Sequence, residues 1–219
     1  MRDKEIRILC YGDSNTWGYI SGTNYNRLLK SKRWTGMLQE ALGNQYLIIE
    51  EGLNGRTISS NDPRPEKAGK NGYDYLIPCL DSQDPLDIVI LMLGTNDLKK
   101  RYGKTTKQIG EDIESTMVKT ILNRKSQFMS TTPELILICP PLINENAEYC
   151  KDIYEGASEK SKKLNKIYKK ISEKYNCKFI SNDNLTTGID GVHLDEDSHK
   201  KLASSLVNCI RDLTNYQKN

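Results

Sequence analysis

Two segments far apart in the sequence could together supply a nucleophile and its base. Ser14 follows Gly12 and Asp13 at the end of an apolar run, where the glycine permits a tight turn. Asp190 precedes His193 by three residues, so its carboxylate can reach the imidazole and leave Nε2 free as a base. Taken alone, Asp13 or Ser14 would more simply cap a helix. The combination indicates nucleophilic acyl transfer.

Two further segments offer groups that could stabilise an oxyanion. Asn96 follows another apolar run, and its side-chain NH2 is a hydrogen-bond donor. An asparagine after a glycine commonly bonds its own backbone instead, which is the alternative interpretation. Gly52 and Gly55 follow a third run, and either could leave a backbone N–H open to a ligand.

The base must be one of the chain's two histidines. His199 is the competing candidate, because Glu196 precedes it by three residues. Residues 195–201 are typical of the capped first turn of a helix, so His199 is expected to decorate that helix. His193 is therefore the predicted base.

Short apolar runs rich in β-branched residues alternate with segments of helical period. The predicted strands cover residues 6–10, 46–50, 88–93, 135–139 and 178–180. Helices are predicted over 34–42 and 73–80 and around three apolar stripes, at residues 109–121, 164–175 and 202–213. This alternation predicts an α/β fold with a parallel sheet. The candidate residues should then meet at its carboxyl edge, surrounded by loops 18–32, 55–72 and 140–157.

Composition narrows the class of protein. The 219 residues suit a single domain over 1–219, with 37% hydrophobic and 28% charged residues. A net charge of +3 with both signs dispersed argues against a nucleic-acid partner. No apolar stretch is long enough for membrane insertion, and the first residues are too charged for a signal peptide, so a cytoplasmic location is expected. The six cysteines have no metal-ligand spacing, and the Gly-x-Ser-x-Gly elbow and dinucleotide motif are absent.

The four segments together resemble the SGNH (GDSL-type) hydrolase family over almost the whole chain. Its four name-giving residues would be Ser14, Gly55, Asn96 and His193. Residues 50–57 and 94–99 resemble the arylesterase and acyltransferase-like branch, which includes small-ester and carbohydrate acetylesterases, often dimers or larger rings. The chain departs from the pattern at Asn15, where the family has leucine.

The resemblance implies a flavodoxin-like three-layer α/β/α sandwich with a five-stranded parallel sheet. It implies Ser14 as nucleophile, His193 as base and Asp190 as its orienting acid. The oxyanion hole would comprise the N–H groups of Ser14 and Gly55 with the Asn96 side chain. Gly55 is favoured over Gly52 because residues 54–57 match the family block in register. No metal or organic cofactor is implied, and a homo-oligomer is expected.

The expected activity is hydrolysis of short acyl esters of small molecules, with acetyl groups on carbohydrates favoured. The alternatives are acyltransferase or lysophospholipase-like activity at the same site, or a catalytically silent ligand-binding module. Two Phe and two Trp in the chain argue against long acyl chains. Asp13 and Trp17 are predicted to contact the substrate. Aromatic residues that could line a pocket or stack on a sugar are Trp17, Tyr19, Tyr25 and Trp34, although Trp34 falls in a helical stripe and core packing is equally expected.

Overall fold

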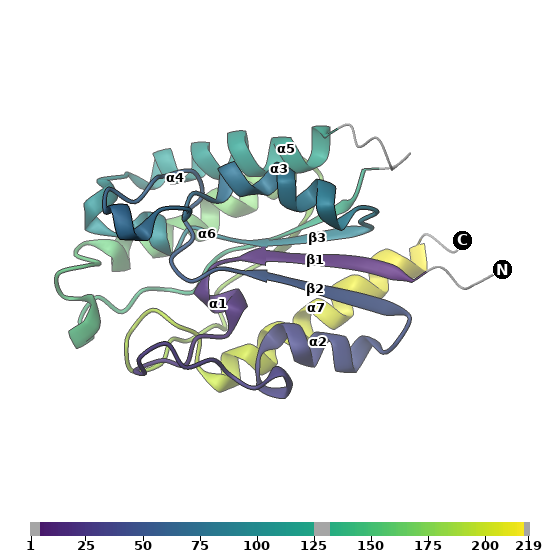
Figure 1. The fold of residues 1–219 in the computed structure, drawn as a ribbon, viewed down its shortest axis with the longest axis horizontal. Helices are drawn as coiled ribbons and strands as arrows, with labels where there is room; N and C mark the ends of the chain where they lie inside the picture. The colour runs from purple at the N-terminus through teal and green to yellow at the C-terminus, as the bar shows by residue number, and fades with distance from the viewer. Residues whose placement is uncertain (1–4, 125–131, 217–219) are drawn as a thin grey trace.

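A central parallel sheet positions the four chemistry-bearing segments. The computed structural model describes residues 5–124 and 132–216 (Figure 1). Five strands are paired in the order β2-β1-β3-β4-β5. Their bounds are β1 Ile6–Gly12, β2 Tyr46–Gly52, β3 Ile88–Met92, β4 Glu134–Ile138 and β5 Lys178–Ile180. All five predicted strands are confirmed, with ends that shift by at most two residues.

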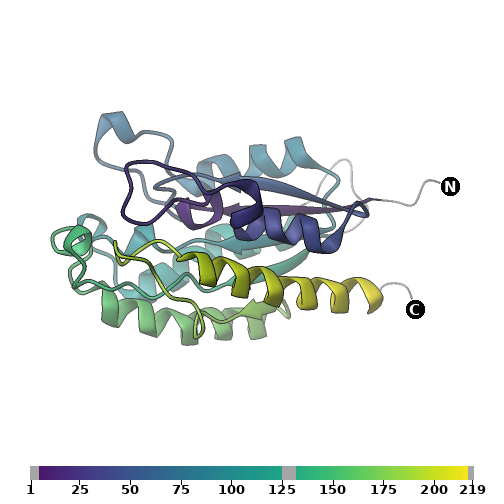
Figure 2. The ribbon, with the colours of Figure 1, turned by 90° about the horizontal axis from the view of Figure 1, so that it is seen from below.

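The helices cover both faces of the sheet and make three layers. One face carries α3 (Gly72–Gln83), α4 (Thr106–Asp112), a π-helical segment (Ile113–Val118), α5 (Lys119–Asn123) and α6 (Ala157–Lys174) (Figure 1). The other carries α1 (Ser14–Trp17), α2 (Trp34–Leu42) and α7 (Glu196–Tyr216), and α2 and α7 lie side by side in Figure 2. Short 3₁₀ turns occupy Lys30–Lys32, Pro65–Lys67, Asn96–Leu98, Lys100–Tyr102 and Glu148–Cys150. The expected α/β/α sandwich is confirmed.

Alternate side chains along the strands pack into two separate hydrophobic cores, one on each face of the sheet. Leu9 and Tyr11 of β1 face the cluster under α3 and α6, whereas Ile8 and Cys10 face the cluster that includes Trp34 of α2. A strand buried on both faces must be apolar throughout. This explains why the strand signals in the sequence are continuous runs rather than alternating patterns.

The stripe at residues 109–121 takes an unexpected helical form. Its four apolar residues are fully or almost fully buried and recur every fourth position: Ile109, Ile113, Met117 and Ile121. In an α-helix of 3.6 residues per turn, each such step would rotate the stripe away from the core by about 40°. The π-helical segment at Ile113–Val118 has a wider turn, and it keeps the stripe facing the sheet.

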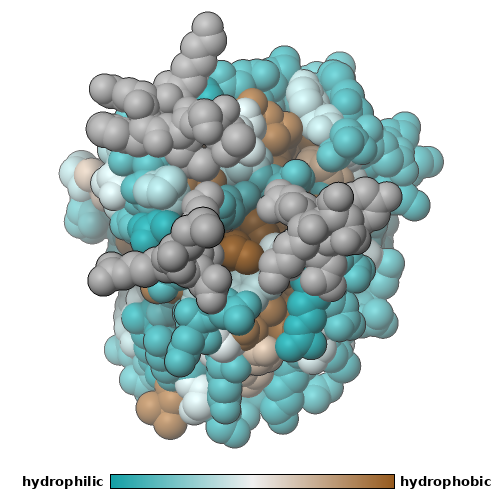
Figure 3. All heavy atoms as spheres, turned by 90° about the vertical axis from the view of Figure 1, so that its right-hand side faces the viewer, coloured by the Kyte–Doolittle hydropathy of each residue, from teal (hydrophilic) through white to brown (hydrophobic). Residues whose placement is uncertain are grey.

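The register of the sheet aligns the ends of its strands. Gly12 at the end of β1 pairs with Gly52 of β2 and with Met92 of β3, so the loops after these three strands emerge at one edge. Figure 3 looks onto the opposite end, where the visible surface outside the grey residues is largely hydrophilic. No helix in the described ranges is long and apolar enough to cross a membrane.

Candidate active site

The turn from β1 into α1 presents Ser14 at the carboxyl edge. The Asp13 side chain caps this short helix by accepting a hydrogen bond from the Asn15 N–H at 2.9 Å. Gly12 is required here because a Cβ at this position would clash with Thr16 Oγ1 and lie 2.8 Å from the Met92 carbonyl oxygen. Ser14 is 5% exposed and lines a pocket.

Ser14, His193 and Asp190 form a continuous hydrogen-bonded chain. The Ser14 hydroxyl lies 2.9 Å from His193 Nε2, and His193 Nδ1 lies 2.7 Å from Asp190 Oδ2. Burial raises the pKa of Asp190, but the hydrogen bond and charge of His193 outweigh burial and lower this pKa well below its usual range. Because an ionised carboxylate can only accept, His193 Nδ1 donates, and Nε2 is left to accept the Ser14 proton.

Backbone groups fix the orientation of the Asp190 carboxylate. The N–H groups of Val192 and His193 both donate to Asp190 Oδ1 at 3.0 Å. Gly22 N–H, from the loop after α1, donates to Oδ2 at 3.2 Å. The carboxylate is thus held from two directions while it orients the imidazole.

Asn15 connects the segment of Ser14 to the segment of His193. Its Oδ1 accepts from the Leu194 N–H at 2.8 Å, and its Nδ2 donates to the Val192 carbonyl oxygen at 3.4 Å. Both contacts are buried and bridge the helix that begins at Ser14 to the residues flanking His193. A leucine could make neither contact. The departure of Asn15 from the family pattern was the available signal for this role.

The Asn96 side chain has a defined orientation. Lys99 Nζ donates to Asn96 Oδ1 at 2.6 Å, which identifies the other terminal atom as the NH2. That nitrogen donates to the Arg56 carbonyl oxygen at 2.9 Å and lies 3.5 Å from Asp13 Oδ2. Asn96 lines the same pocket as Ser14. Sequence reasoning did not assign a role to Lys99.

Of the two candidate glycines, Gly55 lies on the pocket wall. It adopts a φ of +82°, which favours glycine. Gly52 ends β2 instead and packs against α1, where an added Cβ would clash with Trp17 N. Gly55, and not Gly52, therefore lines the same pocket as Ser14 and Asn96.

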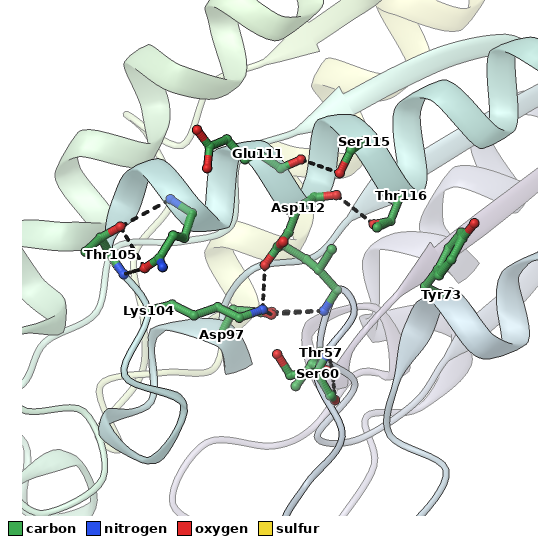
Figure 4. A network of polar contacts seen from close by, with 12 residues as sticks. Thr57, Ser60, Tyr73, Asp97, Lys104, Thr105, Glu111, Asp112, Ser115 and Thr116 are labelled. Atoms are coloured by element: carbon green, nitrogen blue, oxygen red, sulfur yellow. Dashed lines mark hydrogen bonds and ion pairs between the residues drawn. The ribbon is translucent and has the colours of Figure 1, made fainter.

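A buried polar network braces the Gly55 segment against the turn that carries Asn96 (Figure 4). Asp97 accepts from the Ile58 N–H at 3.0 Å and contacts Lys104 Nζ at 3.4 Å. Lys104 also donates to Asp112 at 2.6 Å. Burial raises the pKa of Asp97 to about 6, although Lys104 opposes this effect.

Arg56 links the ends of the first two strands. Its guanidinium donates to the carbonyl oxygens of Gly12, at 2.8 Å, and Glu51, and it lies 4.2 Å from the centre of the Tyr11 ring. Arg56 is 2% exposed. The sequence alone had not suggested roles for Arg56 or Asp97.

The pocket over Ser14 has a volume of about 380 Å³. All three loops named from the sequence line it, through side chains that include Tyr25, Lys70 and Tyr149. Tyr19 stacks on His193 with ring centres 4.1 Å apart. No group of three or more His, Cys, Asp or Glu side chains within residues 5–124 and 132–216 is arranged to hold a metal ion.

Three sequence-predicted residues lie elsewhere. Asp13 is fully buried beneath the pocket as a helix cap, so the expected substrate contact does not fit its position. Trp17 is not among the pocket-lining residues, and its ring packs under Arg27 at 5.0 Å. Trp34 is fully buried in the core, where its Nε1 donates to the Asn15 carbonyl oxygen at 3.1 Å.

His199 lies on α7 as expected, but its side chain does not decorate the surface. It is fully buried, and its Nδ1 accepts from the Trp34 N–H at 3.2 Å. Burial lowers the pKa of His199 to about 4. The structure therefore places it in the core rather than beside Ser14.

Comparisons with known proteins agree with this geometry. Residues 10–201 match the model of the GDSL-like lipase/acylhydrolase family. An aryl esterase from M. smegmatis is 33% identical with a TM-score of 0.87, and the alignment covers 95% of this chain and 99% of that chain. A carbohydrate acetylesterase from Sinorhizobium meliloti gives the same identity, TM-score and coverage.

A curated relative is longer than this chain. An acetylxylan esterase from Xylanibacter ruminicola is 23% identical over 237 residues, which cover 96% of this chain but 44% of the relative. This chain thus spans less than half of that protein. Because the family model matches most of the sequence, the chain belongs to the GDSL-like lipase/acylhydrolase family.

Proposed function

We propose that the protein is a serine esterase that hydrolyses short acyl esters of small molecules or carbohydrates through an acyl-enzyme. The observation that carries this proposal is the hydrogen-bonded chain Ser14–His193–Asp190 at the base of a pocket. A nucleophile, a base and an orienting acid are the components of covalent acyl transfer.

The first half-reaction acylates Ser14. Its Oγ attacks the ester carbonyl carbon while His193 Nε2 removes the hydroxyl proton. Asp190 stabilises the resulting imidazolium, which then protonates the departing alkoxide as the carbon–oxygen bond of the ester breaks. In the second half-reaction His193 Nε2 takes a proton from water as the water oxygen attacks the acyl carbon. The bond between that carbon and Ser14 Oγ then breaks, His193 returns the proton to Oγ, and the carboxylic acid leaves.

The tetrahedral intermediates need hydrogen-bond donors for their oxyanion. Ser14 N–H, Gly55 N–H and Asn96 Nδ2 are the proposed donors, because all three residues line the pocket. Lys99 holds the Asn96 amide oxygen and thereby keeps the NH2 group on the donor side.

The pocket supports a short acyl group. Its wall near His193 is aromatic, with Tyr19 stacked on the imidazole and Tyr25 packed edge-on against Tyr19 at 5.9 Å. Much of the remaining lining is polar or charged rather than a continuous apolar groove for a long chain. The named activities of the similar aryl esterase and carbohydrate acetylesterase are consistent with such a substrate.

The test compares p-nitrophenyl acetate, butyrate and octanoate as substrates for the wild type and Ser14→Ala. We expect activity to fall with chain length and to vanish in Ser14→Ala. Ser205→Ala, on the exposed side of α7, is the matched control and should behave as the wild type. Activity that survives in Ser14→Ala would identify another nucleophile. An inactive wild type would favour the ligand-binding alternative.

A further inference from the structure

The pocket over Ser14 is much more cationic than the chain as a whole. Five cationic side chains line it: Arg64, Lys67, Lys70, Lys99 and Arg101. The acidic residue in the lining is Asp62. The complete chain, by contrast, has 32 basic and 29 acidic residues. The positive charge of the pocket is therefore a local feature.

Asp62 cannot neutralise this cluster. Its carboxylate accepts hydrogen bonds from Arg64 at 2.7 and 2.8 Å and lies 3.5 Å from Arg101. In the described part of the chain, no carboxylate lies within ion-pair distance of Lys67, Lys70 or Lys99. Three lysines thus share the pocket without a directly paired acid.

The lysines are also placed where they repel one another or other cations. Burial, followed by the charges of Lys67 and Arg56, lowers the pKa of Lys70. Burial and then Arg101 lower the pKa of Lys99 to about 8, despite the opposing attraction of Asp13 and Asp62. Placing buried cations close to one another lowers the stability of the fold. Such unfavourable arrangements of charge concentrate at functional sites.

Two of these lysines lie beside the proposed oxyanion donors. Lys99 bonds directly to the Asn96 amide, and the Lys70 Cδ would lie 3.9 Å from a Cβ built on Gly55. A charge next to these donors would be adjacent to the reacting carbonyl of a bound ester. The cationic side of the pocket can therefore contact a substituent of the substrate while Ser14 attacks it.

We infer that the enzyme prefers esters that carry a second, anionic group, which the cluster of Lys67, Lys70 and Lys99 binds during reaction. This inference rests on the proposed esterase activity and names its substrate class. An anionic group can form charge-assisted hydrogen bonds with ammonium groups, and it offsets the repulsion among them. The group can belong to the alcohol or to the acyl part of the ester.

The experiment measures a preference ratio, defined as kcat/KM for an anionic ester divided by kcat/KM for its neutral partner. 4-Acetoxybenzoate against methyl 4-acetoxybenzoate tests an anion on the alcohol part. 4-Nitrophenyl hemisuccinate against 4-nitrophenyl butyrate tests an anion on the acyl part. The same pairs are measured in Lys67→Ala/Lys70→Ala and in the control Lys166→Ala/Lys169→Ala, which removes the same charge from the exposed side of α6.

We expect the ratio of at least one pair to fall about tenfold in Lys67→Ala/Lys70→Ala and to stay unchanged in the control. In the wild type, the ratio should also fall as sodium chloride rises from 20 to about 500 mM, because salt screens exposed charges. The pair that responds identifies the part of the ester that carries the anion.

Comparing a ratio between variants cancels the intrinsic reactivity of each ester. If Lys67→Ala/Lys70→Ala lowered kcat/KM equally for anionic and neutral esters, the lysines would serve the oxyanion instead, which would overturn the inference. An unchanged ratio for both pairs would overturn it as well. A wild type that hydrolyses none of the four esters would refute the esterase proposal itself, a distinct result.

Discussion

The two ends of the Asn96 amide have separate partners. Its oxygen accepts from Lys99, and its nitrogen donates to the Arg56 carbonyl oxygen at 2.9 Å and, more weakly, to Asp13 Oδ2 at 3.5 Å. Such pre-orientation matters because a donor fixed before reaction does not have to reorganise as charge develops.

Replacing Asn96 with alanine should lower kcat about 10²–10³-fold, because a donor to the oxyanion would be lost. Steady-state kinetics on p-nitrophenyl acetate measure the effect, and circular dichroism confirms that the variant is folded. A folded Asn96→Ala enzyme with unchanged kcat would remove Asn96 from the oxyanion hole.

Substitutions of the two histidines should have different effects on kcat. His193→Ala removes the proposed base, so kcat should fall by about 10⁴-fold or more at neutral pH. His199→Gln alters a buried contact with the Trp34 N–H and should retain kcat close to that of the wild type. Parallel kinetics on one ester test this assignment, and the opposite order of effects would contradict it.

At the scale of elements, the backbone of the segment that carries His193 is attached to α1 by the side chain of Asn15. Asn15 pairs with backbone groups on both sides of His193. The distance between Ser14 Oγ and His193 Nε2 therefore depends on the packing of α1 against residues 192–194.

Asn15→Leu restores the family's leucine and leaves the Leu194 N–H without its partner. A buried donor left unsatisfied costs about 1–3 kcal/mol, so the melting temperature should fall. We also expect a lower kcat, because the segment carrying His193 loses its attachment. Asn208→Leu on the exposed side of α7 is the matched control for thermal unfolding and kinetics. Wild-type kcat in Asn15→Leu would show that this attachment does not position the base.

The elements were predictable because their signals are local. Each buried strand is a short apolar run, and the helix at 34–42 has the predicted bounds. The four-residue spacing of apolar residues at 109–121 is compatible with the π-helical segment. The same spacing also occurs in an α-helix whose apolar stripe winds slowly around the helix, so the sequence did not distinguish a π-helix from an α-helix. Ser14, His193 and Asp190 were found because their residue types limit the possible chemistry.

The contacts that were missed depend on segments far apart in the sequence. Asn15 reaches Leu194 across 179 residues, and the partner of Asp97 is 39 residues away. The structure does not place Asp13 or Trp17 in the pocket lining, because proximity to Ser14 in sequence does not decide which side chains face the pocket. Asp13 instead caps α1, and the Trp17 ring packs against Arg27.

For the whole molecule, two buried groups make the free energy of unfolding depend on pH in opposite directions. His199 has a pKa of about 4 in the fold, below its ordinary value of 6.5, so its contribution to stability is lost as pH falls from 6.5 through 4. Asp97 has a pKa of about 6, above its ordinary 3.8, so its protonation stabilises the fold as pH falls over nearly the same window. Each effect amounts to about 3 kcal/mol at most.

Variants should separate these opposing effects. As pH falls from 7 to 5, the free energy of unfolding of His199→Gln should rise relative to that of the wild type. Over the same change, the free energy of unfolding of Asp97→Asn should fall relative to that of the wild type. Urea unfolding at each pH provides the measurement, and each variant is compared with itself at pH 7 so that any constant loss of packing cancels. Parallel pH profiles for all three proteins would contradict the assignment of these two buried groups.

The two ends of the Ser14–His193 hydrogen bond are separated by 179 residues. A ribosome that adds 5–20 residues per second needs about 10–40 s to pass from one to the other. Throughout that interval the nascent chain carries Ser14 without its proposed base, which is added only after all five strands have been synthesised. Hydrolysis by the proposed mechanism therefore requires a chain that has been synthesised beyond His193, so ester cleavage in a cell-free synthesis reaction would mark chains that extend past this residue.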